Sequence, residues 1–399
     1  MYVNDILENL ESEVLLFADD TCLFATAPDP TLSAEILNRD LAKINSWATS
    51  WKVTFNPNKS KDIIFSRKLL VNNSPPLIFD STFVERVHEH KHLGLWLTNN
   101  LSWSRQISET VLKANYKLSV LRSVKFLDRS TLDVLYKLTV RSVFDNGLVV
   151  YYNSLTSAEI SRLRQLQYRA AKLCTGALHL TSQASLEKDL AWETVGDRAL
   201  FLGLSLFQKI HANQTRSLIK TIMPKAKYEM FPPMLKTFSD SFFPYFTKKW
   251  NELPNNLKFE TDIGNFKENL KMHFKPKRHK HFNRGSKRGN SLHTQLRVGR
   301  SQLNAHKFGL GLSETDKCLC ERPETVSHFL NSCFLFQEER HALNARMSRI
   351  LPNFTKLSDK TKLKILLDGI NLHSEEQDSR NIPIALAVQS FILQTKRFN

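Results

Sequence analysis

The sequence contains no apolar run long enough to cross a bilayer, and its first residues lack the basic start and apolar core of a signal peptide. These absences predict a protein of the nucleus or cytoplasm that is neither secreted nor held in a membrane. Cysteine is scarce as well, with five in 399 residues. A small, odd number of cysteines gives no sign of a disulfide framework.

Apolar residues, by contrast, are plentiful. Hydrophobic residues make up 41% of the chain and aromatic residues 10%, including 26 phenylalanines. This composition favours folded domains over disorder. A chain of 399 residues is long enough to form about two to three domains, each with its own core.

Acidic residues are absent between Lys271 and Ser313, although the whole chain has 39 Asp and Glu against 56 Lys and Arg, for a net charge of +17. A basic segment without compensating acids favours binding to a phosphate backbone through counterion release. A solvated linker and a nuclear-import signal are alternatives that the sequence does not separate. The candidate nucleic-acid contacts in this segment are Lys275, Lys277, Arg278, Lys280, Arg284, Lys287, Arg288, Arg297 and Arg300.

Two adjacent carboxylates, Asp19 and Asp20, interrupt two short apolar stretches, Val14–Phe17 and Thr21–Ala25, that are typical of β-strands. A tight strand–Asp-Asp–strand hairpin would hold the carboxylates at its tip. There Asp19 can bind divalent cations, which take oxygen ligands and orient a nucleotide triphosphate. Because Asp also favours turns, the same pair in an isolated hairpin would only shape and solvate the turn.

The middle of the chain predicts helices. Thr156 and Glu159 form a capping box that opens a helical pattern, and Gly176 would end it. Another helix is predicted to start near Ser130, with Asp133 in its first turn, where the helix dipole favours an acid. The face opposite the apolar stripe of the first helix carries Arg162, Arg164, Arg169 and Lys172. These residues would either contact a nucleic-acid duplex or simply be solvated.

Between residues 201 and 274, prolines break the chain into short pieces while aromatic residues supply apolar surface. We expect these aromatics to pack in a core, since so many large side chains rarely stay exposed. Stacking on unpaired bases is the alternative. Residues Ile263–Phe274 then predict one more amphipathic helix.

A second group of chemically active residues follows the pattern C-x-C-x7-H-x4-C and consists of Cys318, Cys320, His328 and Cys333. Thiolate and imidazole are the ligands that tetrahedral zinc prefers, and four of them leave no open position for water. The first two cysteines are closer than in the usual C-x2-C pair, and buried free thiols beside a surface histidine are the alternative. The other cysteines, Cys22 and Cys174, lie in apolar patterns and are expected in the core.

The order of these motifs resembles the reverse transcriptase of non-LTR retrotransposons, in particular the jockey-like group. Phe17-Ala18-Asp19-Asp20 matches the catalytic Asp-Asp box, and Tyr2–Ile6 matches the stretch before it. The residues Trp47–Trp51, Phe55-Asn56, Lys59 and Ile63–Ser66 resemble the next palm motif of the family. The segment Phe83–Trp103 resembles its primer-grip hairpin. The family's C-terminal region is matched by Trp250–Pro254, Phe266-Lys267, Leu296–Gly299 and the Cys/His cluster.

The resemblance implies RNA-templated DNA synthesis with magnesium and deoxynucleotides, and an element RNA template and target DNA as partners. It implies that Asp19 is a metal ligand, that Asp20 supports it, and that Lys59 approaches the triphosphate; a solvated lysine is the alternative for Lys59. The family also needs a metal-binding Asp and a fingers region before the hairpin, and the roughly dozen residues available here are too few for two strands. We therefore expect the C-terminal part of a longer polyprotein, inactive alone.

These predictions describe an α+β chain. Residues 1–105 are expected to form the C-terminal half of a polymerase palm, which is a small antiparallel sheet with the Asp-Asp hairpin and a primer-grip-like hairpin. A helical thumb-like region (106–200) and an aromatic-rich connector (201–275) should follow. The last two parts are a basic linker (276–312) and a mostly helical zinc-binding region (313–399). The alternative function is a non-enzymatic, nucleic-acid-binding remnant of a retroelement whose hairpin is vestigial. A third interpretation makes the Cys/His cluster a protein-interaction module.

Overall fold

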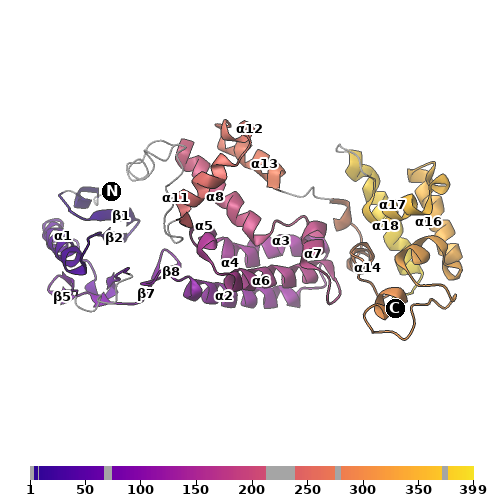
Figure 1. Cartoon of the computed structure of the whole chain (residues 1–399), viewed down its shortest axis with the longest axis horizontal. Coiled ribbons are helices and arrows are strands. Elements are labelled where there is room, and N and C mark those ends of the chain that lie inside the picture. The colour runs from indigo at the N-terminus through magenta and orange to yellow at the C-terminus, as the bar shows by residue number, and fades with distance from the viewer. Residues whose placement is uncertain (1–3, 8, 67–73, 213–238, 275–279, 371–375) are drawn as a thin grey trace. The chain divides into compact units, whose positions relative to one another are not determined.

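The computed structural model describes residues 4–7, 9–66, 74–212, 239–274, 280–370 and 376–399 (Figure 1). The chain divides into two compact units, Met1–Glu109 and Thr110–Asn399, here called unit 1 and unit 2. The small sheets all lie in unit 1 and the described part of unit 2 is helical, so the chain as a whole combines helices and strands as an α+β chain does. Within the described residues, no helix combines the length and apolar composition that crossing a membrane requires.

Unit 1 combines one long helix with short two-stranded sheets. Helix α1 (Pro30–Trp51) starts at Asp29, whose side chain accepts a hydrogen bond from the Thr31 N–H. The antiparallel pairs are β1 (Glu13–Phe17) with β2 (Asp20–Phe24), β4 (Ile78–Phe79) with β5 (Thr82–Phe83) and β7 (Glu89–His92) with β8 (Leu95–Thr98), and β3 (Lys61–Asp62) pairs in parallel with β6 (Glu85–Arg86). Short 3₁₀ turns cover Asn4–Leu7 and Pro57–Lys59.

The core of unit 1 fixes which face of the β1–β2 hairpin is buried. Leu16 and Leu23 pack against a cluster that includes Ile44 of α1 and Phe79 of β4. Because successive side chains of a strand point to opposite faces, Phe17 lies on the exposed face. The hairpin is therefore attached to α1 along one face only.

Unit 2 is built from helices, and α2 (Ser104–Ser123) spans the division between the units. Its first helices are α3 (Arg129–Leu135), α4 (Ser142–Asp145), α5 (Leu148–Tyr151), α6 (Ser157–Thr175), α7 (Gln183–Leu190) and α8 (Val195–Ala212), with a π-helical stretch at Tyr136–Arg141. They are followed by α11 (Phe242–Asn251), α12 (Asn255–Lys258), α13 (Ile263–Phe274), α14 (Lys287–Arg297), α15 (Asn304–Phe308), α16 (Gln337–Ile350), α17 (Asp359–Asp368) and α18 (Glu376–Gln394).

Several local predictions for these helices are confirmed. The capping box is present at Thr156 and Glu159, and α6 ends at Gly176, whose φ of 66° is in the left-handed region that suits glycine. The predicted helix Ile263–Phe274 is α13, and its Phe266 is buried in an aromatic core with Trp250 and Phe246. Core packing is thus confirmed for Phe246 and Trp250, whereas Phe259 is 80% exposed and the prediction is wrong for it; Phe231 and Phe238 lie outside the described residues.

The position of Asp133 differs from its prediction. The side chain of Asp128 accepts the Thr131 N–H at 2.9 Å and so caps α3. Asp133 lies beyond the first turn and is buried, where it accepts a hydrogen bond from the Trp192 indole at 2.6 Å and pairs with Lys137. The sequence contains two acids near this start, and the earlier one is the cap.

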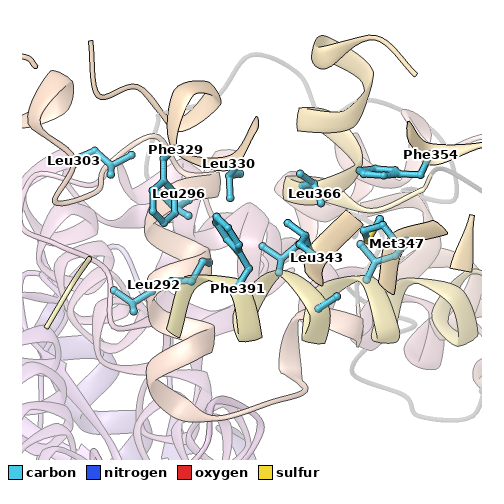
Figure 2. Packing of buried hydrophobic residues seen from close by; sticks show 14 residues of the cluster. Leu292, Leu296, Leu303, Phe329, Leu330, Leu343, Met347, Phe354, Leu366 and Phe391 are labelled. Atoms are coloured by element: carbon cyan, nitrogen blue, oxygen red, sulfur yellow. The ribbon is translucent and has the colours of Figure 1, made fainter. Parts of the chain in front are cut away.

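The segment 276–312, predicted to be a basic linker, contains a packed helix. In α14, Leu292 and Leu296 belong to a hydrophobic core with α16, α17 and α18. Figure 2 shows them gathered with Phe329, Leu330 and Phe391. The prediction of a linker relied on the many basic residues in and around α14 and did not consider its apolar face.

Candidate metal sites and nucleic-acid contacts

The Asp-Asp motif forms the predicted hairpin. Phe17 pairs with Asp20, so Ala18 and Asp19 make a two-residue turn between β1 and β2. Ala18 has a φ of 54°, in the left-handed region. Both Asp19 and Asp20 are exposed at the tip of the hairpin. This arrangement presents two neighbouring carboxylates to solvent, where a divalent cation can reach them.

Helix α1 anchors the chain immediately before the hairpin. The Asp40 carboxylate is fully buried and accepts the N–H groups of Glu11 at 2.9 Å and Ser12 at 2.6 Å. Burial alone would raise the pKa of Asp40, but these backbone donors bring that pKa below its ordinary value. Arg39 adds an ion pair to Glu11 at 2.7 Å. The start of β1 is thus fixed to α1 by charge-assisted hydrogen bonds.

Strands β7 and β8 form the hairpin that was predicted as the primer grip. His92 pairs with Leu95, and the two residues between them, Leu93 and Gly94, both have positive φ, which is the geometry of a type I′ turn. Burial lowers the pKa of His90, the charges of His92 and Lys61 lower it further, and the charge of Asp20 raises it. The predicted primer-grip hairpin therefore lies within electrostatic range of the Asp-Asp hairpin.

Lys59 ends the turn Pro57–Lys59 and is exposed, two residues before Lys61. Its predicted approach to a triphosphate stays a prediction, as do the metal-binding roles of Asp19 and Asp20.

The four residues of the Cys/His pattern come together as one cluster. Their ligand atoms all lie within 4.8 Å of one another. The Sγ of Cys333 is 3.6 Å from that of Cys318 and 3.9 Å from that of Cys320, and the Nε2 of His328 is 3.1 Å from the Cys320 Sγ. Zinc–sulfur bonds of about 2.3 Å in a tetrahedron place two sulfurs about 3.8 Å apart. These donors therefore fit a tetrahedral zinc ion.

Contacts from the surrounding chain hold this cluster in place. Arg340 of α16 donates to the carbonyl oxygens of Leu330 at 3.1 Å and Cys333 at 2.5 Å. Glu324 is 2% exposed and forms a two-pronged ion pair with Arg397 near the C-terminus, at 2.5 and 2.7 Å. Such supporting contacts orient metal ligands. Sequence reasoning found the four ligands but not these two arginines, because Arg340 acts on main-chain carbonyl oxygens and Arg397 pairs with an acid 73 residues away.

The predicted nucleic-acid contacts fall into different environments. Lys275, Lys277, Arg278 and the side chain of Lys280 lie outside the described residues. Arg284 is exposed. Arg288 is also exposed and donates to the Phe398 carbonyl at 3.0 Å and the Asn399 side chain at 2.6 Å. The Arg300 guanidinium lies 3.1 Å from the His306 Nε2.

Two further residues of this set are bound to other helices of unit 2. The Lys287 amino group donates to the carbonyl oxygens of Leu173 at 3.2 Å and Cys174 at 2.8 Å, at the end of α6, and burial lowers its pKa. Arg297 lies 3.5 Å over the Phe282 ring and forms an ion pair with Asp189 at 2.5 Å. In this conformation neither cation faces a phosphate backbone, and binding by the segment stays a prediction.

Asp189 connects three helices that the sequence did not relate. It is buried in α7 between Arg129 of α3, at 2.7 Å, and Arg297 of α14. Burial would raise the pKa of Asp189, but the two guanidinium groups lower it to about 2. Arg129 also donates to the Thr294 hydroxyl at 3.1 Å. We call this group the Arg–Asp–Arg network.

The basic face predicted on α6 is present. Arg164 is exposed, Arg169 donates to the Asn115 side chain at 2.8 Å, and the Lys172 amino group lies 4.5 Å over the Tyr168 ring. This face is therefore partly engaged with its neighbours.

Comparison with known proteins confirms the predicted resemblance to jockey-like retrotransposon polymerases. The probable RNA-directed DNA polymerase from transposon X-element of Drosophila melanogaster is 24% identical over 191 residues, which cover 47% of this chain and 21% of the relative. The RNA-directed DNA polymerase from the mobile element jockey of Drosophila funebris is 24% identical over 197 residues, which cover 47% of this chain and 21% of the relative. The jockey polymerase of Drosophila melanogaster is 22% identical over 211 residues, which cover 51% of this chain and 22% of the relative.

The chain spans about a fifth of the length of the curated relatives it matches. No family model matches this chain. No solved structure matches it either.

Proposed function

We propose that the chain is the C-terminal part of a non-LTR retrotransposon reverse transcriptase, an enzyme that copies RNA into DNA by metal-assisted nucleotidyl transfer. The observation that carries the proposal is the pair of exposed carboxylates, Asp19 and Asp20, at the tip of a hairpin that α1 anchors. The similarity of about half of the chain to RNA-directed DNA polymerases supports it. In this proposal, unit 1 belongs to a palm and the first helices of unit 2 to a thumb.

Each residue of the hairpin region then has a role. Magnesium, when bound, would neutralise charge on the triphosphate and activate the attacking hydroxyl. Asp19 would hold the ion, Asp20 would support that contact, and Asp40 would keep the strand in position. Lys59 would approach the incoming triphosphate, and the β7–β8 hairpin, within electrostatic range of Asp20, would support the primer end.

The isolated chain is expected to show no polymerase activity. The two-metal mechanism needs carboxylates that hold the ions from both sides, and the motif match supplies only Asp19 and Asp20 on one hairpin. Primer extension on an RNA template should therefore give the same background for this chain and for Asp19→Ala. The Drosophila melanogaster jockey polymerase is the positive control. Template-dependent incorporation that disappears in Asp19→Ala would contradict the expected inactivity.

The second candidate function is a non-enzymatic nucleic-acid-binding protein. Its support is the net charge of +17 together with the acid-free segment between Lys271 and Ser313. The partners would be RNA and DNA, reached in the nucleus or the cytoplasm. Binding through phosphates would show little sequence preference and a strong dependence on salt.

If the basic segment binds phosphates, removing its cations should change the salt dependence of binding. Neutralising Lys275, Lys277, Arg278 and Arg284 together should flatten the slope of log affinity against log salt, by about 0.9 for each phosphate of duplex DNA that the variant no longer neutralises. Fluorescence anisotropy at several salt concentrations measures the slope.

Lys287→Met is the matched control. Because the Lys287 amino group is bound to two carbonyl oxygens inside unit 2, its removal should lower thermal stability and leave the slope unchanged. An unchanged slope in the fourfold variant would instead mean that the segment does not contact phosphates.

The Cys/His cluster would bind one structural zinc ion through Cys318, Cys320, His328 and Cys333. All four positions of a tetrahedral shell are then filled by protein, so we assign the ion no catalytic step.

A further inference from the structure

A groove of about 300 Å³ lies between α16 and α18 in the C-terminal part of unit 2. The two helices pack side by side (Figure 1). The groove combines two cations with aliphatic surface, and its lining consists of Arg346, Arg349, Ile350, Pro383, Leu386 and Ala387. None of these residues belongs to the motifs that predicted the hairpin or the Cys/His cluster.

The aliphatic floor of the groove is the outer side of a packed core. Ala387 belongs to the hydrophobic cluster of unit 2, and Ile350 packs against that cluster. Met347 of α16 lies in the same core (Figure 2). Pro383 and Leu386 are exposed, with Leu386 at 40%. The floor is therefore held by the fold and open to a ligand.

The two arginines of the groove are exposed and lie one turn apart on α16, so they share one face. In the described part of the chain, neither forms an ion pair. The acids of the same helix, Glu338 and Glu339, are about two turns away or more, on the order of 10 Å along the axis. Within the described residues, the arginine pair thus places two cations that form no ion pair at the edge of an apolar surface.

From these features we infer that the groove binds single-stranded nucleic acid, with phosphates at Arg346 and Arg349 and an unpaired base on the floor made by Pro383 and Leu386. Arginine matches phosphate geometry better than any other side chain. A duplex keeps its bases stacked inside, so only a single strand can offer a base face to the floor. This inference rests on the nucleic-acid-binding function proposed above and assigns a site to it.

An acidic peptide is the other ligand that the charges would admit. An amphipathic helix bound in a groove uses anchors spaced over about two turns or more. The six residues that line this groove offer space for one flat group beside two cations. A single base fits that space better, and the experiment below separates the two ligands.

The test measures binding of the whole chain to a labelled 20-nucleotide single strand and to the matching duplex at several salt concentrations. In Arg346→Gln/Arg349→Gln, the affinity for the single strand should fall about tenfold and the salt slope should decrease by about 1.4, the value for two phosphate contacts on a single strand. Lys360→Gln/Lys364→Gln removes the same charge from exposed positions of α17 and should change neither quantity.

Leu386→Ser tests the floor separately. This variant should weaken single-strand binding about threefold to tenfold, leave the salt slope unchanged because both phosphate-binding arginines remain, and leave duplex affinity unchanged. Leu386 is partly exposed, so the substitution spares the core, and equal melting temperatures would verify this.

Single-strand binding that is unaffected by the arginine variant would overturn the groove assignment while leaving the proposed function intact. The groove assignment is also overturned if both variants weaken the binding of an acidic peptide but do not weaken the binding of any oligonucleotide. A whole chain that binds no nucleic acid at low salt would overturn the proposed function and the groove together.

Discussion

Replacing Cys333 by serine is expected to unfold residues near 313 to 345 and to abolish zinc binding. Cys333 is buried and its Sγ is near those of Cys318 and Cys320, so the substitution removes a ligand that solvent does not readily replace. Zinc binding in small modules contributes on the order of 10 kcal/mol of apparent free energy that doubles as folding energy. The β1–β2 hairpin and helices α3 and α6 should remain folded.

The packing around the cluster predicts how far the unfolding extends. Phe329 and Leu330, between His328 and Cys333, are buried in the core shared with α14 and α18. Arg340 binds the Cys333 carbonyl, so the start of α16 should also lose protection. Hydrogen exchange and limited proteolysis between Arg300 and Arg346 measure this effect, and metal analysis measures zinc.

Cys22→Ser is the matched control, because Cys22 lies in β2 of unit 1 and outside the cluster. It should keep one equivalent of zinc and the protease resistance of the C-terminal region. Less than about half an equivalent of zinc in the unaltered chain, purified without chelator, would show that the cluster is packing rather than a metal site. Unchanged protease resistance in Cys333→Ser would show the same.

The features predicted correctly from the sequence have local causes. The strand–Asp-Asp–strand pattern, the capping box at Thr156 and Glu159 and the helix end at Gly176 each depend on residues within a few positions of one another. The Cys/His pattern spans only sixteen positions, from Cys318 to Cys333. Backbone geometry and ligand chemistry specify such features almost directly, so the sequence alone sufficed.

The features that the sequence did not predict depend on partners far along the chain. Lys287 and Arg297 look like free cations in a basic run, yet Lys287 caps the carbonyl end of α6 and Arg297 pairs with Asp189. An acid-free segment can still be neutralised by an acid more than a hundred residues away. Charge counting in a window therefore predicted a linker where the chain forms a core helix.

The Arg–Asp–Arg network also predicts a large loss of stability in Asp189→Asn. The substitution would leave the guanidinium groups of Arg129 and Arg297 buried without a counter-charge, since their side chains are 2% and 4% exposed. Removing one partner of a buried ion pair costs about 3–5 kcal/mol. We therefore expect the urea unfolding transition of unit 2, monitored by far-UV circular dichroism at neutral pH, to occur at a lower urea concentration, in proportion to this loss of free energy.

Asp359→Asn is the control for this loss, since Asp359 is exposed and pairs with Lys362 at 3.8 Å on the surface. Such a pair contributes about 0–1 kcal/mol, so this variant should unfold close to the unaltered chain. Equal stability of the two variants would mean that burial of the network contributes nothing beyond a surface pair.

The pH dependence gives a second, independent test of the same network. The folded pKa of Asp189 is lowered to about 2, against about 3.9 for an unfolded aspartate. Because the folded value is the lower one, the stabilisation is fully present above about pH 4 and is lost as the pH falls toward 2. Asp189→Asn lacks this titration, so the stability difference between it and the unaltered chain should shrink across this window. A difference that stays constant from pH 5 to pH 2 would show that Asp189 stabilises unit 2 by packing and not by its charge.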